Sequence, residues 1–180
     1  MPKLDRLSEN SLTPEIVSLI SGAPLPGLAD GPQCAETKSG ILELKKTSHE
    51  FSNSLSEAGL WLLAGELDWS HSISQGYDSA EGSFWHGIMH RREGDFGNSK
   101  YWFRRVGKHH VHKELSRVIA TEAESITAAG LPLHGLQDPN SLPDSLVNLC
   151  DEALASKKEW IPTLSTICWW EWQLLFASSQ

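Results

Sequence analysis

The sequence predicts an all-α protein, a single-domain helical bundle of about eight helices. Large apolar residues recur at the spacing of one helix face, as Phe84, Trp85, Ile88 and Met89 do. Glycines such as Gly94 follow several of these runs, where a helix can end in a left-handed residue. The chain length of 180 residues suits one domain with a substantial core.

The N-terminal part, residues 1–40, is predicted to be rich in loops. Its one clear helix begins at Thr13-Pro14-Glu15, which combines an N-cap, a proline in the first turn and an acid. This helix is expected to run through Ile20. Residues 21–40 are rich in Gly, Pro and Ala, include Asp30-Gly31-Pro32 and are expected to form a loop. A short helix is expected over residues 41–46, alone or as the start of a longer helix through His49.

Residues 54–107 are predicted to form two helical hairpins. The first joins a helix over 55–64 to a helix over 67–75, with Gly65 at the turn. The second joins a helix over 82–92 to one capped by Asp95 or Asn98. The apolar stripe of this last helix is expected to consist of Tyr101, Trp102 and Val106.

The two hairpins align as an internal repeat, in which corresponding residues are 29 apart. The aligned pairs are Ala58 and Gly87, Trp61 and His90, Gly65 and Gly94, Ser70 and Ser99, and Ile73 and Trp102. This pattern resembles tetratricopeptide repeats, with Gly94-Asp95 at the turn and Phe103 in the second helix. The spacing is shorter than the usual 34 residues, His90 replaces the first aromatic, Ser74 replaces another, and no closing proline follows Phe103. The resemblance implies stacked antiparallel hairpins and a peptide-binding groove.

A second resemblance rests on the run HGIMHRREGDFGN followed by KYWFRRVG. This run is similar to the signature of a family of small uncharacterised bacterial and fungal proteins. The resemblance implies no activity, but it selects the same polar positions as the analysis below.

Residues 110–180 are predicted to supply helices that pack around the hairpins. An amphipathic helix is expected over 111–126, a loop over 129–141, a helix over 143–155 and a final helix over 162–177. The final helix is apolar over most of its circumference and should be central. Its exception is Glu171, which is expected either to pair with an arginine of residues 83–106 or to face solvent.

The net charge of −8 argues against a nucleic-acid or anionic-membrane partner. The central segment, residues 83–106, is locally basic, which favours a small anion as the ligand.

Cys34, Cys150 and Cys168 are widely spaced and form no CxxC motif, which fits reduced thiols. The N-terminal segment lacks an apolar signal region and no long uncharged apolar run is present, so a cytoplasmic protein is expected.

The central segment also carries the candidate catalytic residues His86, His90 and Glu93, which share one helix face at i, i+4 and i+7. In stacked hairpins His71 should point towards the two histidines, which predicts a metal site of His71, His86 and His90. Zinc, iron and manganese are the candidate metals, with Glu93 or Asp68 as a further ligand. The alternative is that these histidines only hydrogen-bond between packed helices. The tract His109, His110 and His112 suggests a metal site, but no other ligand is near in the sequence, so these histidines are expected to be solvent-exposed.

Arginines flank the hairpin turn from both sides. They are expected either to pair with Glu93 and Asp95 or to hold an anion in a bidentate fork. The candidate ligand-binding residues are Arg91, Arg92, Asp95, Asn98, Tyr101, Arg104, Arg105 and Glu171.

Three functions remain open on this basis. The first is a pocket that binds a small anionic ligand and acts on it, with a divalent metal or with a histidine as general base. The second is an interaction module that binds a protein partner. The third is a polar network that is purely structural, with the activity elsewhere in a larger assembly. The segment Gly94-Asp95-Phe96-Gly97 is too short and wrongly placed for a phosphate-binding loop.

Overall fold

The computed structural model describes residues 4–7, 12–29, 33–49 and 51–179, and all regular structure in these ranges is helical. The fold is therefore all-α, as predicted, with ten α-helices in the described ranges instead of about eight. The helices are α1 (Pro14–Gly22), α2 (Ala35–Thr47), α3 (Leu55–Leu63), α4 (Leu67–Ser74), α5 (Ala80–Glu93), α6 (Phe96–Val106), α7 (His110–Thr121), α8 (Ala123–Ala128), α9 (Leu142–Ala155) and α10 (Ile161–Ser178), with a 3-10 turn, η2 (Lys158–Trp160), before α10.

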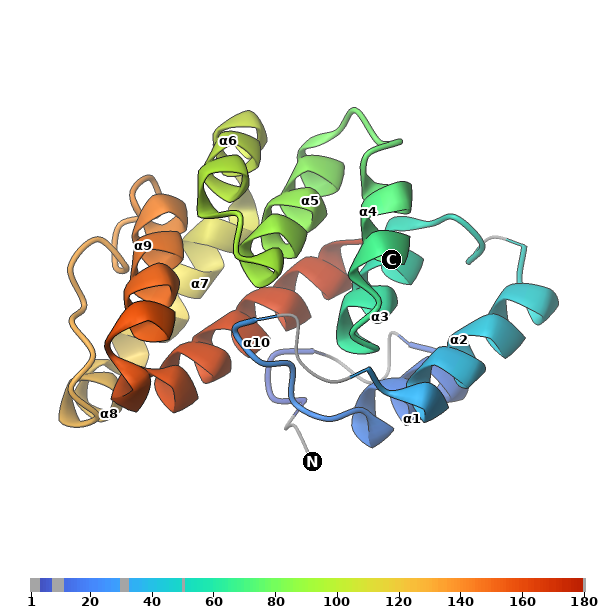
Figure 1. Cartoon of the computed structure of the whole chain (residues 1–180), viewed down its shortest axis with the longest axis horizontal. Coiled ribbons are helices and arrows are strands. Elements are labelled where there is room, and N and C mark those ends of the chain that lie inside the picture. The colour runs from blue at the N-terminus through green and yellow to red at the C-terminus, as the bar shows by residue number, and fades with distance from the viewer. Residues whose placement is uncertain (1–3, 8–11, 30–32, 50, 180) are drawn as a thin grey trace.

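The central helices form a row of adjacent pairs. Helix α3 packs on α4 and α5 on α6, and α4 in turn contacts α5. Figure 1 shows α3 with α4 and α5 with α6 as neighbouring hairpins, followed by α9 on the far side of α6. The second helix of one pair thus lies against the first helix of the next, as the repeat predicted.

Close packing inside the second pair depends on small residues. The Ser99 hydroxyl donates to the Gly87 carbonyl oxygen at 2.8 Å, and both residues are buried. A Cβ atom at Gly87 would lie 3.2 Å from the Phe103 ring. The turn itself passes through Gly94, whose φ of 86° is costly for any residue with a Cβ atom.

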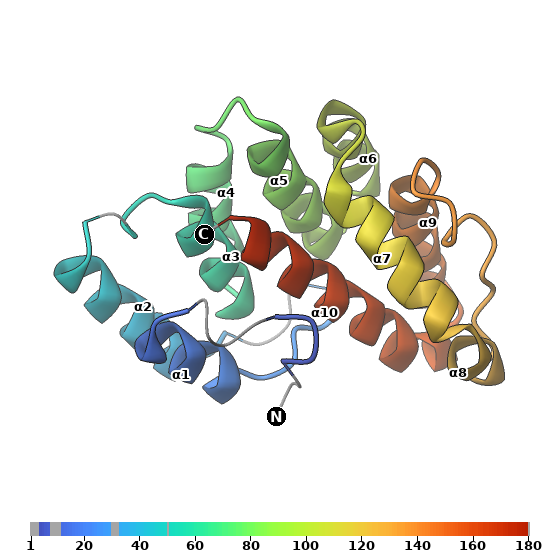
Figure 2. The same ribbon diagram turned by 180° about the vertical axis from the view of Figure 1, so that it is seen from behind.

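Helix α10 is shared by the two hydrophobic cores. In the first core, Trp169, Trp172, Leu175 and Phe176 pack with residues of α1 to α6. In the second, residues from the first half of α10, such as Ile167, pack with residues of α7, α8 and α9. Figure 2, the view from behind, shows α10 running diagonally across the row of hairpins. The final helix is therefore central, as its apolar composition predicted.

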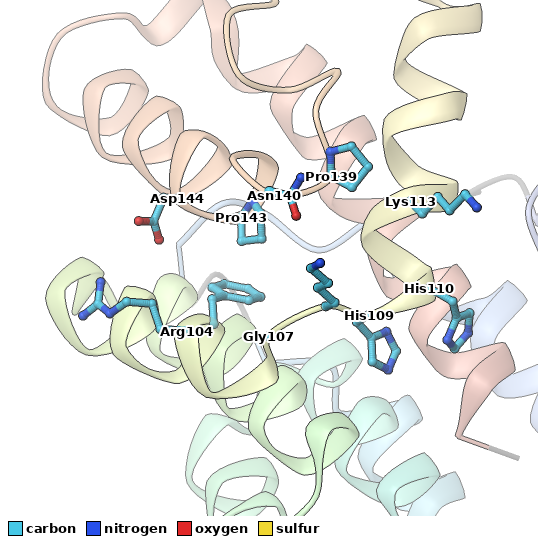
Figure 3. A pocket seen from close by; sticks show the side chains of 11 residues that line it. Arg104, Gly107, His109, His110, Lys113, Pro139, Asn140, Pro143 and Asp144 are labelled. Carbon is cyan, nitrogen blue, oxygen red and sulfur yellow. The ribbon is translucent and has the colours of Figure 1, made fainter.

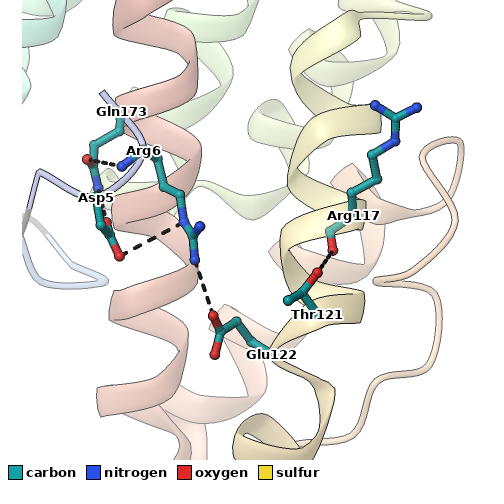
Figure 4. Close-up of polar contacts among 6 residues, drawn as sticks. All are labelled: Asp5, Arg6, Arg117, Thr121, Glu122 and Gln173. Atoms are coloured by element: carbon teal, nitrogen blue, oxygen red, sulfur yellow. Dashed lines mark hydrogen bonds and ion pairs between the residues drawn. The ribbon is translucent and has the colours of Figure 1, made fainter. Parts of the chain in front are cut away.

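The segment before α1 is attached to this central helix by polar contacts (Figure 4). The Arg6 backbone N–H donates to Gln173 Oε1 at 3.1 Å, and the Gln173 amide donates to Asp5 at 3.2 Å. Arg6 also forms an ion pair with Glu122, at the junction of α7 and α8, at 3.2 Å. Because Gln173 is fully buried, these bonds satisfy a polar group that α10 could not leave unpaired.

Two elements differ most from the prediction. Helix α2 begins at Ala35, inside the expected loop, while Asp30 to Pro32 lie outside the described residues. The start of α2 is anchored by a bond from the Cys34 N–H to the Ala64 carbonyl oxygen at 2.9 Å, a tertiary contact with no local sequence signal. The helix expected over 111–126 is instead divided at Glu122 into α7 and α8, and Ile126 of α8 is buried in the second core.

Two predictions of exposure and burial were wrong. Tyr101 is 47% exposed, and Phe103 takes its place in the buried stripe of α6. His112 is 1% exposed and packs against Phe84, whereas the tract was expected to face solvent. Of the three histidines, only His110 is exposed. No helix of the described residues is both long and apolar enough to cross a membrane.

Candidate functional site

Three histidines meet where α4 packs against α5. His71 lies on α4, and His86 and His90 lie one turn apart on α5. One ring nitrogen from each of the three lies within 4.8 Å of the other two. The ring centroids of His71 and His86 are 4.6 Å apart, and those of His71 and His90 are 5.5 Å apart. The expectation that His71 points towards the pair on α5 is confirmed.

Local sequence determines how closely the two helices can approach. Helix α5 is capped by the Ser79 side chain, which accepts from the Gly82 N–H at 3.0 Å. A Cβ atom at Gly82 would lie 2.6 Å from the Tyr77 carbonyl oxygen, so only glycine lets the connection from α4 fold back this tightly. The turn after α4 therefore brings His71 close to α5.

His86 is the innermost of the three histidines, at 2% exposure. Burial, together with the nearby His71, His90 and Arg105, lowers the pKa of His86 to about 3. The imidazole is therefore neutral at pH 7. Its Nδ1 atom is buried and has no hydrogen-bond partner among the described residues. A buried polar atom without a partner is costly, and such atoms in native structures often belong to a functional site.

His90 is held by two polar neighbours. Its Nδ1 lies 3.0 Å from Glu93 Oε2, and its Nε2 lies 3.1 Å from Asn98 Nδ2. A carboxylate can only accept, so Nδ1 carries the proton and Nε2 presents its lone pair. Hydrogen bonding of one imidazole nitrogen to a carboxylate is the arrangement that orients histidine ligands in metalloproteins.

An aromatic wall covers the other side of the cluster. The Trp102 ring stacks on His86 with centroids 3.9 Å apart and an interplanar angle of 14°. The guanidinium of Arg105 lies over Trp102, with its Cζ atom 5.1 Å from the ring centroid. His86 in turn stacks on His90 at 4.8 Å. Trp102 thus restricts the rotation of the His86 ring.

The predicted arginine pairs with Glu93 and Asp95 are not formed. Arg91 is buried and instead pairs with the buried Glu171 of α10, which confirms the predicted partner of that carboxylate. Arg105 pairs with Asp78, in the connection before α5, at 2.9 Å.

The other candidate ligand-binding residues are dispersed. Arg92 is buried and donates to the carbonyl oxygens of Leu62 and Ala29. The Asp95 side chain caps α6 by accepting from the Asn98 N–H at 3.0 Å. Tyr101 and Arg104 are exposed on α6. Of the residues predicted from the sequence, the structure brings together His71, His86, His90, Glu93 and Asn98, with Arg105 behind Trp102.

One feature of the site was missed in the sequence, namely the role of Trp102 as a wall against His86. Its position was visible in the 29-residue repeat, where Ile73 of the first hairpin corresponds to Trp102. A second histidine group, His109 and His112 around Phe84, was also missed. The burial of His112 could have been predicted from its position three residues before Leu115, because residues three apart share one helix face and Leu115 is fully buried.

No family model, curated protein or solved structure matches this chain in the comparisons made. The assignment of the site therefore rests on its geometry. Three imidazoles from two helices, one of them oriented by a carboxylate, form a donor set suited to a transition metal.

Proposed function

We propose that this protein binds a divalent transition metal between α4 and α5, with His71, His86 and His90 as ligands. The observation that carries the proposal is the convergence of three imidazole nitrogens to within 4.8 Å of one another. Tetrahedral coordination needs ligand nitrogens roughly 3.3 Å apart, which follows from metal–nitrogen distances of about 2.0–2.1 Å. Small rotations of the imidazole rings would bring the nitrogens to that distance. His90 Nε2 would exchange its hydrogen bond from Asn98 Nδ2 for the metal, because both use the same lone pair.

The ligand types limit the choice of metal and its chemistry. Imidazole suits zinc and iron better than manganese, which prefers oxygen ligands. Three protein ligands leave a fourth position for water or an anionic group, as catalytic zinc sites do. The metal could therefore bind a small anionic ligand and polarise it, or activate a bound water. Glu93 would orient His90 rather than act as a ligand, because it already accepts from His90 Nδ1. Without a metal, one of the histidines would act as a general base.

The first experiment is a metal analysis of protein purified without a histidine tag and then dialysed against zinc. We expect near-stoichiometric zinc in the wild type, its loss in His90→Ala, and its retention in His134→Ala. His134 is an exposed histidine outside the cluster and serves as the matched control. Equal zinc in the wild type and His90→Ala, or none in either, would reject the metal site and leave a hydrogen-bonded core.

A second candidate function is a protein-interaction module with tetratricopeptide-like hairpins. Support for it comes from the two helix pairs and from a groove of about 620 Å³ beside α4. This groove is lined by the exposed aromatic residues Trp69 and Tyr77 together with Ile73. Exposed aromatic side chains are common anchors in peptide recognition.

A peptide-display selection tests this alternative. Peptides enriched on the wild type and lost on Trp69→Ser would support it, and no enrichment above an empty surface would reject it.

The free cysteines Cys34, Cys150 and Cys168 agree with a reducing compartment such as the cytoplasm for either function.

A further inference from the structure

A second candidate site lies away from the three histidines. A cavity of about 650 Å³ opens between the end of α6, the start of α7 and the start of α9, and none of the three histidines lines it. Figure 3 shows Arg104 on the α6 side, Lys113 on the α7 side, and Pro139, Asn140 and Pro143 along the wall formed by the segment that leads into α9. The volume is within the range of small-molecule sites, about 300–1,000 Å³.

The cationic side chains of this cavity have no partners among the described residues. Every other described lysine and arginine has an ion pair, a hydrogen bond or an aromatic ring beneath its charge. The three that have none of these are Arg104, Lys108 and Lys113, and all three line the cavity.

This concentration is unexpected in a chain of net charge −8, with 23 acidic and 15 basic residues. Most of the basic residues are paired with the abundant acids. Three unpaired cations around one cavity raise the local potential and attract anions. Asp144 is the one acid in the lining, and it forms no ion pair with any described residue. It is therefore available to accept a hydrogen bond from a ligand.

The helix directions support an anion in the same place. Helices α7 and α9, of 12 and 14 residues, both begin at the cavity, where His110 and Pro143 form part of its lining. The Ser141 N-cap of α9 makes no side-chain cap hydrogen bond. The Leu142 N–H of α9 already donates to the Asp138 carbonyl oxygen, and Pro143 has no N–H. The contribution of the two helices is therefore the partial positive charge of their N-termini, which favours a phosphate or carboxylate.

We propose that this cavity binds a small organic phosphate with a hydroxylated body, such as a sugar phosphate. The phosphate would lie among Arg104, Lys108 and Lys113. The hydroxyl groups would bond to Asp144 and Asn140, and the carbon skeleton would pack against the two prolines of the α9 wall. The three cations favour a ligand with negative charge, and the Asp144 carboxylate favours a ligand that also carries a hydrogen-bond donor. The proposal does not depend on the metal site.

Isothermal titration with glucose 6-phosphate, in low salt, tests the proposal. We expect binding that is weakened by roughly tenfold or more in Lys108→Gln and Lys113→Gln, since each removes a charge-assisted hydrogen bond. The control is Lys46→Gln, which makes the same charge change at an exposed pair with Glu43 on α2. It should alter affinity by no more than about twofold, because distant exposed charges are screened.

Three results would overturn the proposal. The first is no saturable binding of glucose 6-phosphate up to about 10 mM. The second is an equal loss of affinity in Lys46→Gln, which would show that binding depends on the overall charge of the protein and not on this cavity. The third is equal affinity for inorganic phosphate, which would remove the hydroxylated body from the assignment. His90→Ala should bind glucose 6-phosphate as the wild type does, so failure of the metal site and failure of this site are separable.

Discussion

Arg91 of α5 and Glu171 of α10 form an ion pair in which both side chains are buried, at 2% and 0% exposure. Two guanidinium nitrogens, Nη1 and Nη2, face the two carboxylate oxygens in a bidentate arrangement. The pair connects the helix that carries His86 and His90 to the helix shared by the two cores. It thereby helps to hold the histidine helix in place.

Removing one partner of this pair should be costly. We expect Glu171→Gln to lower the free energy of unfolding by about 3–5 kcal/mol, because Arg91 would keep an unpaired charge in the core. The double variant Arg91→Met/Glu171→Leu should recover most of that loss, since neither charge is then buried. Denaturant unfolding measures both values.

The exposed pair of Arg105 and Asp78 provides the control, with side chains 44% and 94% exposed. Asp78→Asn should cost less than about 1 kcal/mol. If the double variant were as unstable as the single one, the pair would contribute through packing shape and not through charge.

Glu93 should determine metal affinity without being a ligand. We expect Glu93→Gln to weaken zinc binding by about 10–100-fold, because His90 loses the carboxylate that orients its ring. Competition with a chelating dye measures the change. Asp95→Asn removes the same charge from the same turn and retains a capping side chain, so its affinity should stay near that of the wild type. Equal affinity in Glu93→Gln and wild type would show that the carboxylate has no orienting role.

Gly59 of α3 is expected to tolerate no larger residue. A Cβ atom at this position would lie 2.8 Å from Cη2 of Trp85, a fully buried ring. Gly59→Ala should therefore destabilise the protein by about 1–3 kcal/mol through overpacking, even though alanine favours helices. At Gly97, on the exposed side of α6, the nearest atom to a Cβ would be 3.7 Å away. Gly97→Ala should be neutral or stabilising by up to about 1 kcal/mol. Thermal unfolding of the two variants compares them directly.

His112 should make the protein less stable in acid. Burial, with the neighbouring His109, lowers the pKa of His112 from 6.5 to about 4. Between these values the unfolded chain binds a proton that the folded chain does not, so stability falls as the pH drops from 6.5 towards 4. The loss from this residue should be on the order of 2–3 kcal/mol.

Unfolding measured from pH 7 to pH 4 tests this expectation. His112→Gln should show a shallower decline over that range than the wild type, and the exposed His110→Gln should decline as the wild type does. Parallel curves for all three proteins would mean that other buried groups, such as His86, account for the acid sensitivity.

Helical periodicity explains why much of this molecule could be predicted from its sequence. Residues that share one helix face, such as His86 and His90, follow from a spacing of four. The repeat then placed His71 opposite them, because consecutive hairpins stack in a regular order. Glu171 was predicted to pair with an arginine because a carboxylate among tryptophans needs a partner.

Contacts that depend on helix rotation and docking were not predictable in this way. Arg105 pairs with Asp78 across 27 positions, and no local pattern prefers that acid to Glu93. Trp102 covers His86 only because α6 crosses α5 at close range through Gly87. The cavity at the start of α9 combines Lys108 with Asp144, residues that have no shared motif.

The position of α10 across both cores has a consequence for protein synthesis. Residues 161–178 complete the packing of the first core and of the second, so neither is closed until this stretch has left the ribosomal exit tunnel. The nascent chain therefore exposes two incomplete apolar surfaces until α10 has emerged from the tunnel. A ribosome stalled before Ile161 should present a substrate for chaperones and proteases, whereas emergence of α10 from the tunnel should bury both surfaces together.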